Sequence, residues 1–129
     1  MARPLRIEYA CARYHVINRG NYRKNLFEGK GAAEAFERTL GEAAVKFAWR
    51  VHAYVVMRIH FHLALELTEP NLSLGMKWLQ GTWTRRFNGL RRLVGRPFQD
   101  RYKSLIVEPG PAFAKVCHYI HLNPCAQAR

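Results

Sequence analysis

Acidic residues are scarce in this chain of 129 residues: nine Asp and Glu stand against 21 Lys and Arg, which gives a net charge of +12 at pH 7. Long apolar runs are missing as well. No stretch approaches the roughly 18 consecutive apolar residues of a membrane-spanning helix, so no membrane partner is expected. The N-terminal stretch MARPLRIEYACARYHV lacks the apolar core of a secretory signal, which favours a cytoplasmic protein.

Cysteine is also rare. Cys11, Cys117 and Cys125 form an odd set without a CxxC pair, so a disulfide framework is not expected. Cys117, His121 and Cys125 lie close together in the sequence, but three donors without a paired motif do not favour a zinc site. Hydrophobic residues still make up 49% of the chain, which is enough for a core. The composition therefore predicts one soluble globular domain over residues 1–129.

The positive charge is concentrated in two segments. Residues 1–30 hold seven basic and two acidic side chains, and residues 85–103 hold seven and one, whereas residues 31–84 hold five of each. Solubility alone would not require this segregation, and clustered basic residues are typical of a polyanion binder. The candidate nucleic-acid contacts in these segments are Arg19, Arg23, Arg85, Arg86, Arg91, Arg92, Arg96, Arg101 and Lys103. Phe98 and Tyr102 are candidates either for base stacking or for the core.

Hydrophobic periodicity predicts the elements of the fold. Residues 12–18 and 102–108 are rich in strand formers, and residues 49–67 form a β stretch too long for one strand, expected to break at 58–59. Apolar residues at helical spacing predict a helix over about 31–47.

Two further helices follow from the same spacing. Asn71 is expected to cap the second, in which apolar residues recur from Leu72 to Leu90, and a third helix is expected to end at Pro124. The order β-α-β-β-α-β-α matches an α+β, ferredoxin-like fold with an added C-terminal helix. We expect a four-stranded antiparallel sheet with the first two helices on one face and the other face open.

His60 and His62 flank Phe61 in the long β stretch. Because side chains alternate along a strand, both imidazoles point to the same face, ~7 Å apart, while Phe61 points to the helices. Two histidines at this spacing can bind one metal ion. Taken alone, two unrelated surface histidines are the commoner explanation. His15, His52 and His118 follow no such pattern and are expected to be structural or surface residues.

The last predicted helix carries a second polar group. Tyr119 and Asn123 are four residues apart and share a face, with Lys115 one turn before them. Phe113 and Ile120 belong to the packing stripe of this helix, so Tyr119 is not needed in it. The alternative is a tyrosine at the edge of the core.

A resemblance to a known family covers most of the chain. It is carried by RPLRIEY, YHVINRGN, HAYVVM followed by HFHL, NLSLGMKWLQ, PFQDRYK and YIHLNP, in this order from about Arg3 to Ala126. These segments resemble the single-tyrosine HUH transposases, in particular the bacterial branch associated with repetitive extragenic palindromes (REP). The resemblance implies a ferredoxin-like fold. It places the family's histidine–hydrophobic–histidine motif at His60–His62, its nucleophilic tyrosine at Tyr119 and its third metal-ligand position at Asn123.

The resemblance implies a DNA transposase that cleaves and joins single-stranded or hairpin DNA through a 5′-phosphotyrosine intermediate. His60, His62 and Asn123 would hold one divalent ion, with Mg²⁺ as the default and Mn²⁺ well suited to imidazole ligands. Tyr119 would attack the scissile phosphate, and Lys115 would support the phenolate or contact DNA. A covalent intermediate of this kind conserves the energy of the broken bond for strand joining.

Two features differ from the family's pattern. Met57-Arg58-Ile59 stands where relatives often carry proline and a small polar or acidic residue. The chain ends at Arg129, where relatives commonly continue. A domain that is truncated at its C-terminus is therefore an alternative interpretation. The alternative function is therefore a catalytically inactive or domesticated single-stranded DNA-binding protein of the same fold. Monomer and homodimer both remain open.

Overall fold

The computed structural model describes residues 11–19, 31–57, 60–91 and 102–126. The elements are β1 (Arg13–Arg19), α1 (Ala32–Phe47), β2 (Trp49–Val56), β3 (His60–Leu67), α2 (Leu72–Arg91), β4 (Lys103–Ile106) and α3 (Pro111–Ala126). This is the predicted order, and the fold is α+β and ferredoxin-like with a C-terminal helix. The long β stretch forms two strands as expected, and the Met57 N–H donates to the His60 carbonyl across the hairpin (2.8 Å).

The four strands form one antiparallel sheet in the order β2-β3-β1-β4. β1 lies between β3 and β4, and its register with β3 runs from Arg13 opposite Glu66 to Arg19 opposite His60. Along β1, the buried residues Tyr14 and Val16 alternate with partly exposed neighbours. Such alternation fixes the register, because a shift by one residue would move every apolar side chain to the wrong face.

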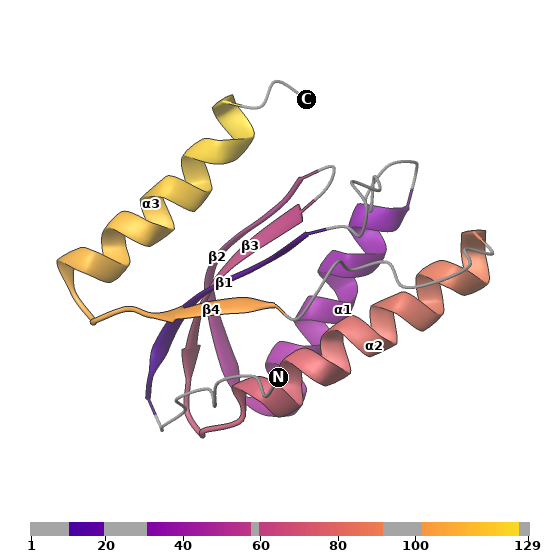
Figure 1. The fold of residues 1–129 in the computed structure, drawn as a ribbon, viewed down its shortest axis with the longest axis horizontal. Coiled ribbons are helices and arrows are strands. Elements are labelled where there is room, and N and C mark those ends of the chain that lie inside the picture. The colour runs from indigo at the N-terminus through magenta and orange to yellow at the C-terminus, as the bar shows by residue number, and fades with distance from the viewer. Residues whose placement is uncertain (1–10, 20–30, 58–59, 92–101, 127–129) are drawn as a thin grey trace, which may run out of the picture.

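The larger core lies between the sheet and the helices α1 and α2, which cover one face (Figure 1). The Phe36 ring of α1 lies 4.8 Å from the Phe61 ring of β3 and 5.9 Å from the Trp83 ring of α2, centroid to centroid. All three side chains are fully buried. Each such burial stabilises the fold by roughly 1.5–3 kcal/mol. None of the helices in the described ranges is long and apolar enough to cross a membrane.

The opposite face is not open as predicted, because α3 packs on part of it (Figure 1). Phe113 and Ile120 of α3 form a second apolar cluster with Ala53, Val55 and Ala64 of the sheet. Phe113 and Ile120 are two helical turns apart and therefore lie on one stripe. Helical spacing predicted a packing stripe with both residues but not the surface that would receive it.

A β-bulge in β2 brings two of the five buried residues of that second cluster to this face. The register with β3 shifts between Val51 and Ala53, so one extra residue is inserted. Before the bulge, Trp49 packs in the larger core. After it, Ala53 and Val55 pack against α3 instead. Strict alternation along β2 would have placed Trp49, Ala53 and Val55 on the same face of the sheet.

The turn before α3 is built from glycine and proline. Gly110 takes φ 96°, a conformation that residues with a side chain rarely adopt. Pro111 then begins α3, where its missing N–H and fixed φ suit the first helical position. The predicted end of this helix at Pro124 is wrong, since α3 continues to Ala126. A proline removes only one backbone hydrogen bond and crowds the preceding turn, and here the helix ends two residues later.

Asn71 stands directly before α2 as predicted, but its side chain has a different role from a cap. Its backbone carbonyl accepts the helical hydrogen bond from the Gly75 N–H (2.9 Å). Its side-chain amide donates to the Phe47 carbonyl (2.9 Å), and its side-chain oxygen accepts from Trp49 Nε1 (3.0 Å). The side chain therefore ties the start of α2 to the corner between α1 and β2.

Gly75 and Gly41 offer a matched test of this packing. A Cβ at Gly75 would overlap the Trp49 indole, whereas a Cβ at Gly41 would meet no atom within 4 Å. We expect Gly75→Ala to destabilise the protein by about 1–3 kcal/mol, because the indole is held in place. Gly41→Ala should stabilise it by about 0.5–1 kcal/mol through helix propensity. Denaturant unfolding measures both, and equal effects would contradict the packing of Trp49 on α2.

Candidate active site

The histidine pair lies on β3, on the sheet face that α3 partly covers. His60 pairs with Arg19 of β1, and His62 pairs with Ile17 of β1 and Val55 of β2. The two imidazole centroids are 5.1 Å apart. His62 is buried and His60 is half-buried, and Phe61 between them lies in the larger core. The prediction that both imidazoles share a face is confirmed.

The spacing of the two rings fits a shared metal ion. A metal–nitrogen bond of about 2.1 Å, extended to the ring centre, places the centroids of two adjacent ligands about 5 Å apart. Asn123, the predicted third ligand, lies in α3 one turn after Tyr119, and its side chain is outside the described part of the chain. Among the residues that the structure describes, no group of three or more His, Cys, Asp or Glu could hold an ion. The two imidazoles are thus the described portion of the predicted metal site.

Tyr119 lies beside this histidine pair. Its ring centroid is 6.0 Å from that of His62, although the two residues come from different elements. Tyr119 is 54% exposed, unlike the buried His62 beside it. The neighbouring Ile120 is fully buried in the second cluster and fixes where Tyr119 emerges. Lys115 is exposed one turn earlier on the same side of α3.

His15 also belongs to this cluster, a position that its sequence pattern did not predict. Its Nε2 lies 3.0 Å from His62 Nδ1, and the two rings stack with centroids 5.3 Å apart. Its centroid is also 6.5 Å from that of Tyr119. The strand alternation of β1 puts His15 on the same face as Arg19, but only the pairing of β1 with β3 brings it to His62.

Burial keeps these imidazoles neutral near pH 7. It lowers the pKa of His62 to about 4, and the neighbouring His60 and His15 act in the same direction. Burial also lowers the pKa of His60, with a smaller effect of Arg19, and lowers the pKa of His15. Desolvation disfavours the charged imidazolium. A neutral imidazole has the lone pair that a metal ion requires.

A polar group around Phe113 holds the first half of α3 on the sheet. The His52 ring meets the Phe113 ring edge to face at 5.0 Å, and the Arg13 guanidinium lies 5.4 Å from its centroid. Glu66 pairs with both His52 and Arg13: its Oε1 lies 2.8 Å from His52 Nε2 and 3.5 Å from Arg13 Nη2. The hydrogen bond from His52 is the main cause of the lowered pKa of Glu66. Together with Ile120, this contact determines how α3 presents Tyr119.

The histidine face also carries two of the predicted DNA contacts. Arg19 lies opposite His60, and Lys103 of β4 lies opposite Ile17, the partner of His62. Residues directly opposite in antiparallel strands share a face, so both cations lie on the same side as the imidazoles. Both are exposed, and they give this surface a positive rim.

The structure does not bring Arg85 and Arg86 to this face. Both lie on α2, in the helical layer on the other side of the sheet. Arg86 forms a bidentate pair with Glu42 of α1 (2.7 and 3.1 Å) and also donates to the Thr39 hydroxyl (3.0 Å). Arg85 donates to the Thr82 hydroxyl (3.3 Å). The other predicted contacts lie outside the described residues or have undescribed side chains: Arg23, Arg91, Arg92, Arg96 and Arg101.

Tyr102 belongs to the core rather than to a base-stacking surface. It is 8% exposed, packs in the larger core and donates from its hydroxyl to Ser73 Oγ (3.3 Å). Phe98 lies outside the described residues.

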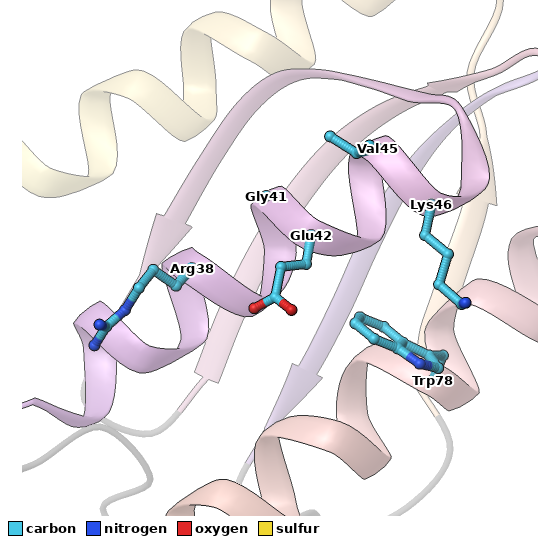
Figure 2. A pocket seen from close by; sticks show the side chains of 6 residues that line it. All are labelled: Arg38, Gly41, Glu42, Val45, Lys46 and Trp78. Carbon is cyan, nitrogen blue, oxygen red and sulfur yellow. The ribbon is translucent and has the colours of Figure 1, made fainter.

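A hollow in the helical layer lies between α1 and α2 (Figure 2), on the far side of the sheet from the histidines. It is lined by Arg38, Gly41, Glu42, Val45, Lys46 and Trp78. Two of its charged groups have partners: Glu42 pairs with Arg86, and Lys46 Nζ lies 5.8 Å from the centroid of a Trp78 ring. The hollow is therefore a feature of the packing between α1 and α2. The histidines and Tyr119 lie on the other side of the sheet.

The fold and the site define a ferredoxin-like domain with a histidine pair on the sheet and an exposed tyrosine on a helix that packs beside it. Residues 9–123 match the family model described as IS200-like transposase. The chain belongs to this family, which confirms the resemblance found in its sequence. No curated protein matches the chain.

Two solved structures share the fold. One is a REP-associated tyrosine transposase bound to a REP hairpin, with 17% identity and a TM-score of 0.76 over 99% of this chain and 75% of that one. The other is a candidate transposase from Deinococcus radiodurans R1, with 22% identity and a TM-score of 0.63 over 93% of this chain and 96% of that one.

The low pKa of His62 predicts a loss of stability in acid. The unfolded chain takes up this proton near pH 6.5, whereas the folded state resists it until about pH 4. Stability present above pH 6.5 is therefore lost as the pH falls through this window. We expect His62→Gln to flatten this dependence, measured with chelator as the free energy of unfolding at about pH 5 and about pH 7.5. His118→Gln, at an exposed position, is the control, and equal pH dependence in the wild type and His62→Gln would contradict the assignment.

Proposed function

We propose that this protein is a metal-dependent DNA transposase that cleaves and rejoins single-stranded or hairpin DNA, with Tyr119 as the nucleophile. The observation that carries the proposal is the position of Tyr119: an exposed phenol 6.0 Å, centroid to centroid, from a buried histidine of a strand distant in sequence. A tyrosine that served only the edge of the core would not need to emerge next to a neutral histidine pair.

The proposed reaction is a transesterification. The Tyr119 oxygen forms a bond to the phosphorus, the bond from phosphorus to the 3′ oxygen breaks, and the products are a 5′-phosphotyrosine and a free 3′-hydroxyl. The phenol loses its proton and the leaving oxygen gains one. The reverse step with a second 3′-hydroxyl joins a new strand, so no nucleotide triphosphate is consumed.

His60 and His62 are the residues that would hold the divalent ion, with Asn123 as the proposed third ligand. The ion would withdraw charge from the scissile phosphate and orient it. Mg²⁺ and Mn²⁺ are the candidates. The neutral state of both imidazoles near pH 7 supports this role, because no proton has to be displaced before an ion binds.

DNA is the proposed substrate because of the charge around the site. Arg19 and Lys103 lie on the histidine face, Lys115 lies beside Tyr119 on α3, and the whole chain carries +12. Such a rim would attract and position phosphates. A single-stranded or hairpin substrate is supported by the REP-associated transposase of the same fold, which is bound to a REP hairpin.

The first test is the covalent adduct. Incubation of hairpin-bearing single strands with the protein and Mn²⁺ should give a denaturant-resistant protein–DNA band. Tyr119→Phe should reduce this band by roughly 10³-fold or more, because it removes the attacking oxygen. DNA binding should stay close to the wild-type level, since the phosphate contacts are unchanged. Tyr54→Phe is the matched control, because Tyr54 is also exposed but donates its hydroxyl to Glu37 of α1 (2.7 Å).

The same gel distinguishes the alternatives. An adduct that persists in Tyr119→Phe would mean that another residue is the nucleophile. A wild-type protein that binds the hairpin tightly but forms no adduct with Mg²⁺ or Mn²⁺ would instead be the inactive DNA-binding protein.

The second test concerns the metal ion. His60→Ala should weaken Mn²⁺ binding by at least about tenfold and reduce adduct formation, because it removes one of the proposed ligands. Affinity for the DNA should change little. Calorimetry measures the ion, and the adduct gel measures the reaction. His118→Ala, at an exposed position of α3, is the control and should behave like the wild type. Equal cleavage in chelator and in Mn²⁺ would contradict the metal assignment.

A further inference from the structure

His15 lies beside both His62 and Tyr119, although its sequence pattern assigned it no chemical role. It is half-buried on β1, opposite Ala64 of β3 and Leu105 of β4. Its Nε2 is 3.0 Å from His62 Nδ1, which is a hydrogen-bond distance. The stacked rings, 5.3 Å apart, hold this contact in a defined orientation.

A hydrogen bond between two neutral imidazoles needs one N–H and one lone pair. Two arrangements satisfy this contact. In the first, His62 donates from Nδ1 to His15 Nε2, and His62 Nε2 keeps its lone pair. In the second, His15 donates to His62 Nδ1, and the proton of His62 sits on Nε2. Only the first arrangement leaves a lone pair on His62 for a metal ion. In the second, the Nδ1 lone pair accepts the proton of His15 and Nε2 carries a proton.

We propose that His15 is a positioning residue for His62: its Nε2 accepts the Nδ1 proton of His62 and so directs the His62 Nε2 lone pair into the site. This inference rests on the proposed metal-dependent function. A ligating histidine commonly donates its second ring nitrogen to such a partner, which fixes the tautomer and the ring orientation. Here a third imidazole from the neighbouring strand takes that place.

His15 is not itself a ligand in this arrangement. The nitrogen that it turns toward His62 is occupied by the contact between the two rings. Within the described residues, His15, His60 and His62 do not form a three-donor group for an ion. Its effect on the reaction therefore passes through His62.

The tautomer of His62 tests the proposal directly and without metal. In the metal-free wild-type protein, ¹⁵N NMR of the imidazoles near pH 7.5 should show the Nδ1–H tautomer at His62. His15→Phe keeps a ring but removes the acceptor, so His62 should shift to the Nε2–H form that an unconstrained imidazole prefers. His15→Gln places an oxygen near the position of Nε2 and should restore the Nδ1–H form. His118→Phe is the control and should leave His62 unchanged.

Metal affinity gives the second readout. The Mn²⁺ dissociation constant should rise about 10–100-fold in His15→Phe and return part of the way in His15→Gln. Adduct formation by His15→Phe should be weak at low Mn²⁺ and recover at saturating Mn²⁺, because the nucleophile and the ligands are intact. Circular dichroism confirms that each variant is folded before it is compared.

Two results would overturn the proposal: an Nε2–H tautomer of His62 in the metal-free wild type, or a Mn²⁺ affinity of His15→Phe within about twofold of the wild type. A failure of the proposed function looks different. In that case the wild type itself binds no Mn²⁺ or forms no adduct, whereas the tautomer measurement still decides whether His15 orients His62.

Discussion

The geometry of the candidate site depends on how α3 docks on the sheet. Ile120 is fully buried against a surface that includes Ala53 and Ala64, and Phe113 is buried two turns earlier. Small side chains on the sheet let the helix backbone approach closely, and two anchors on one stripe prevent it from rotating. The position of Tyr119 follows from the way α3 docks on the sheet. Tyr119 is adjacent to Ile120, so the burial of one side chain determines where the other emerges, 6.0 Å from His62 between ring centroids.

The two faces of the sheet have different tasks. On one face, Phe36, Phe61 and Trp83 pack with α1 and α2 into the larger core, and the Arg86–Glu42 pair joins the two helices at the surface. The other face buries less apolar surface and gathers the polar groups. A site placed there does not have to disturb the packing that stabilises the domain. Phe61 and His62 illustrate this division, since neighbours on one strand serve opposite faces.

The electrostatics of the site face combine two opposed features. The imidazoles are buried enough to lower their pKa values and remain neutral, whereas Arg19 and Lys103 at the rim are exposed and charged. Neutral imidazoles beside exposed cations would suit the proposed function, in which the surface attracts an anionic backbone and the imidazole lone pairs stay free for an ion. His15 belongs to this arrangement through its contact with His62 Nδ1.

Local chemistry explains what the sequence by itself determined: the order of the elements, the shared face of His60 and His62, and the turn at Gly110. Each depends on residues only a few positions apart, whose side-chain period of two or 3.6 is set by the backbone. Family resemblance added the proposal that Tyr119 is the nucleophile. Only the tertiary structure decided that α3 covers part of the second face, that the bulge in β2 turns Ala53 toward it, and that His15 meets His62. These are contacts between segments distant in the chain, and they depend on strand register and helix docking, which periodicity within one segment does not specify.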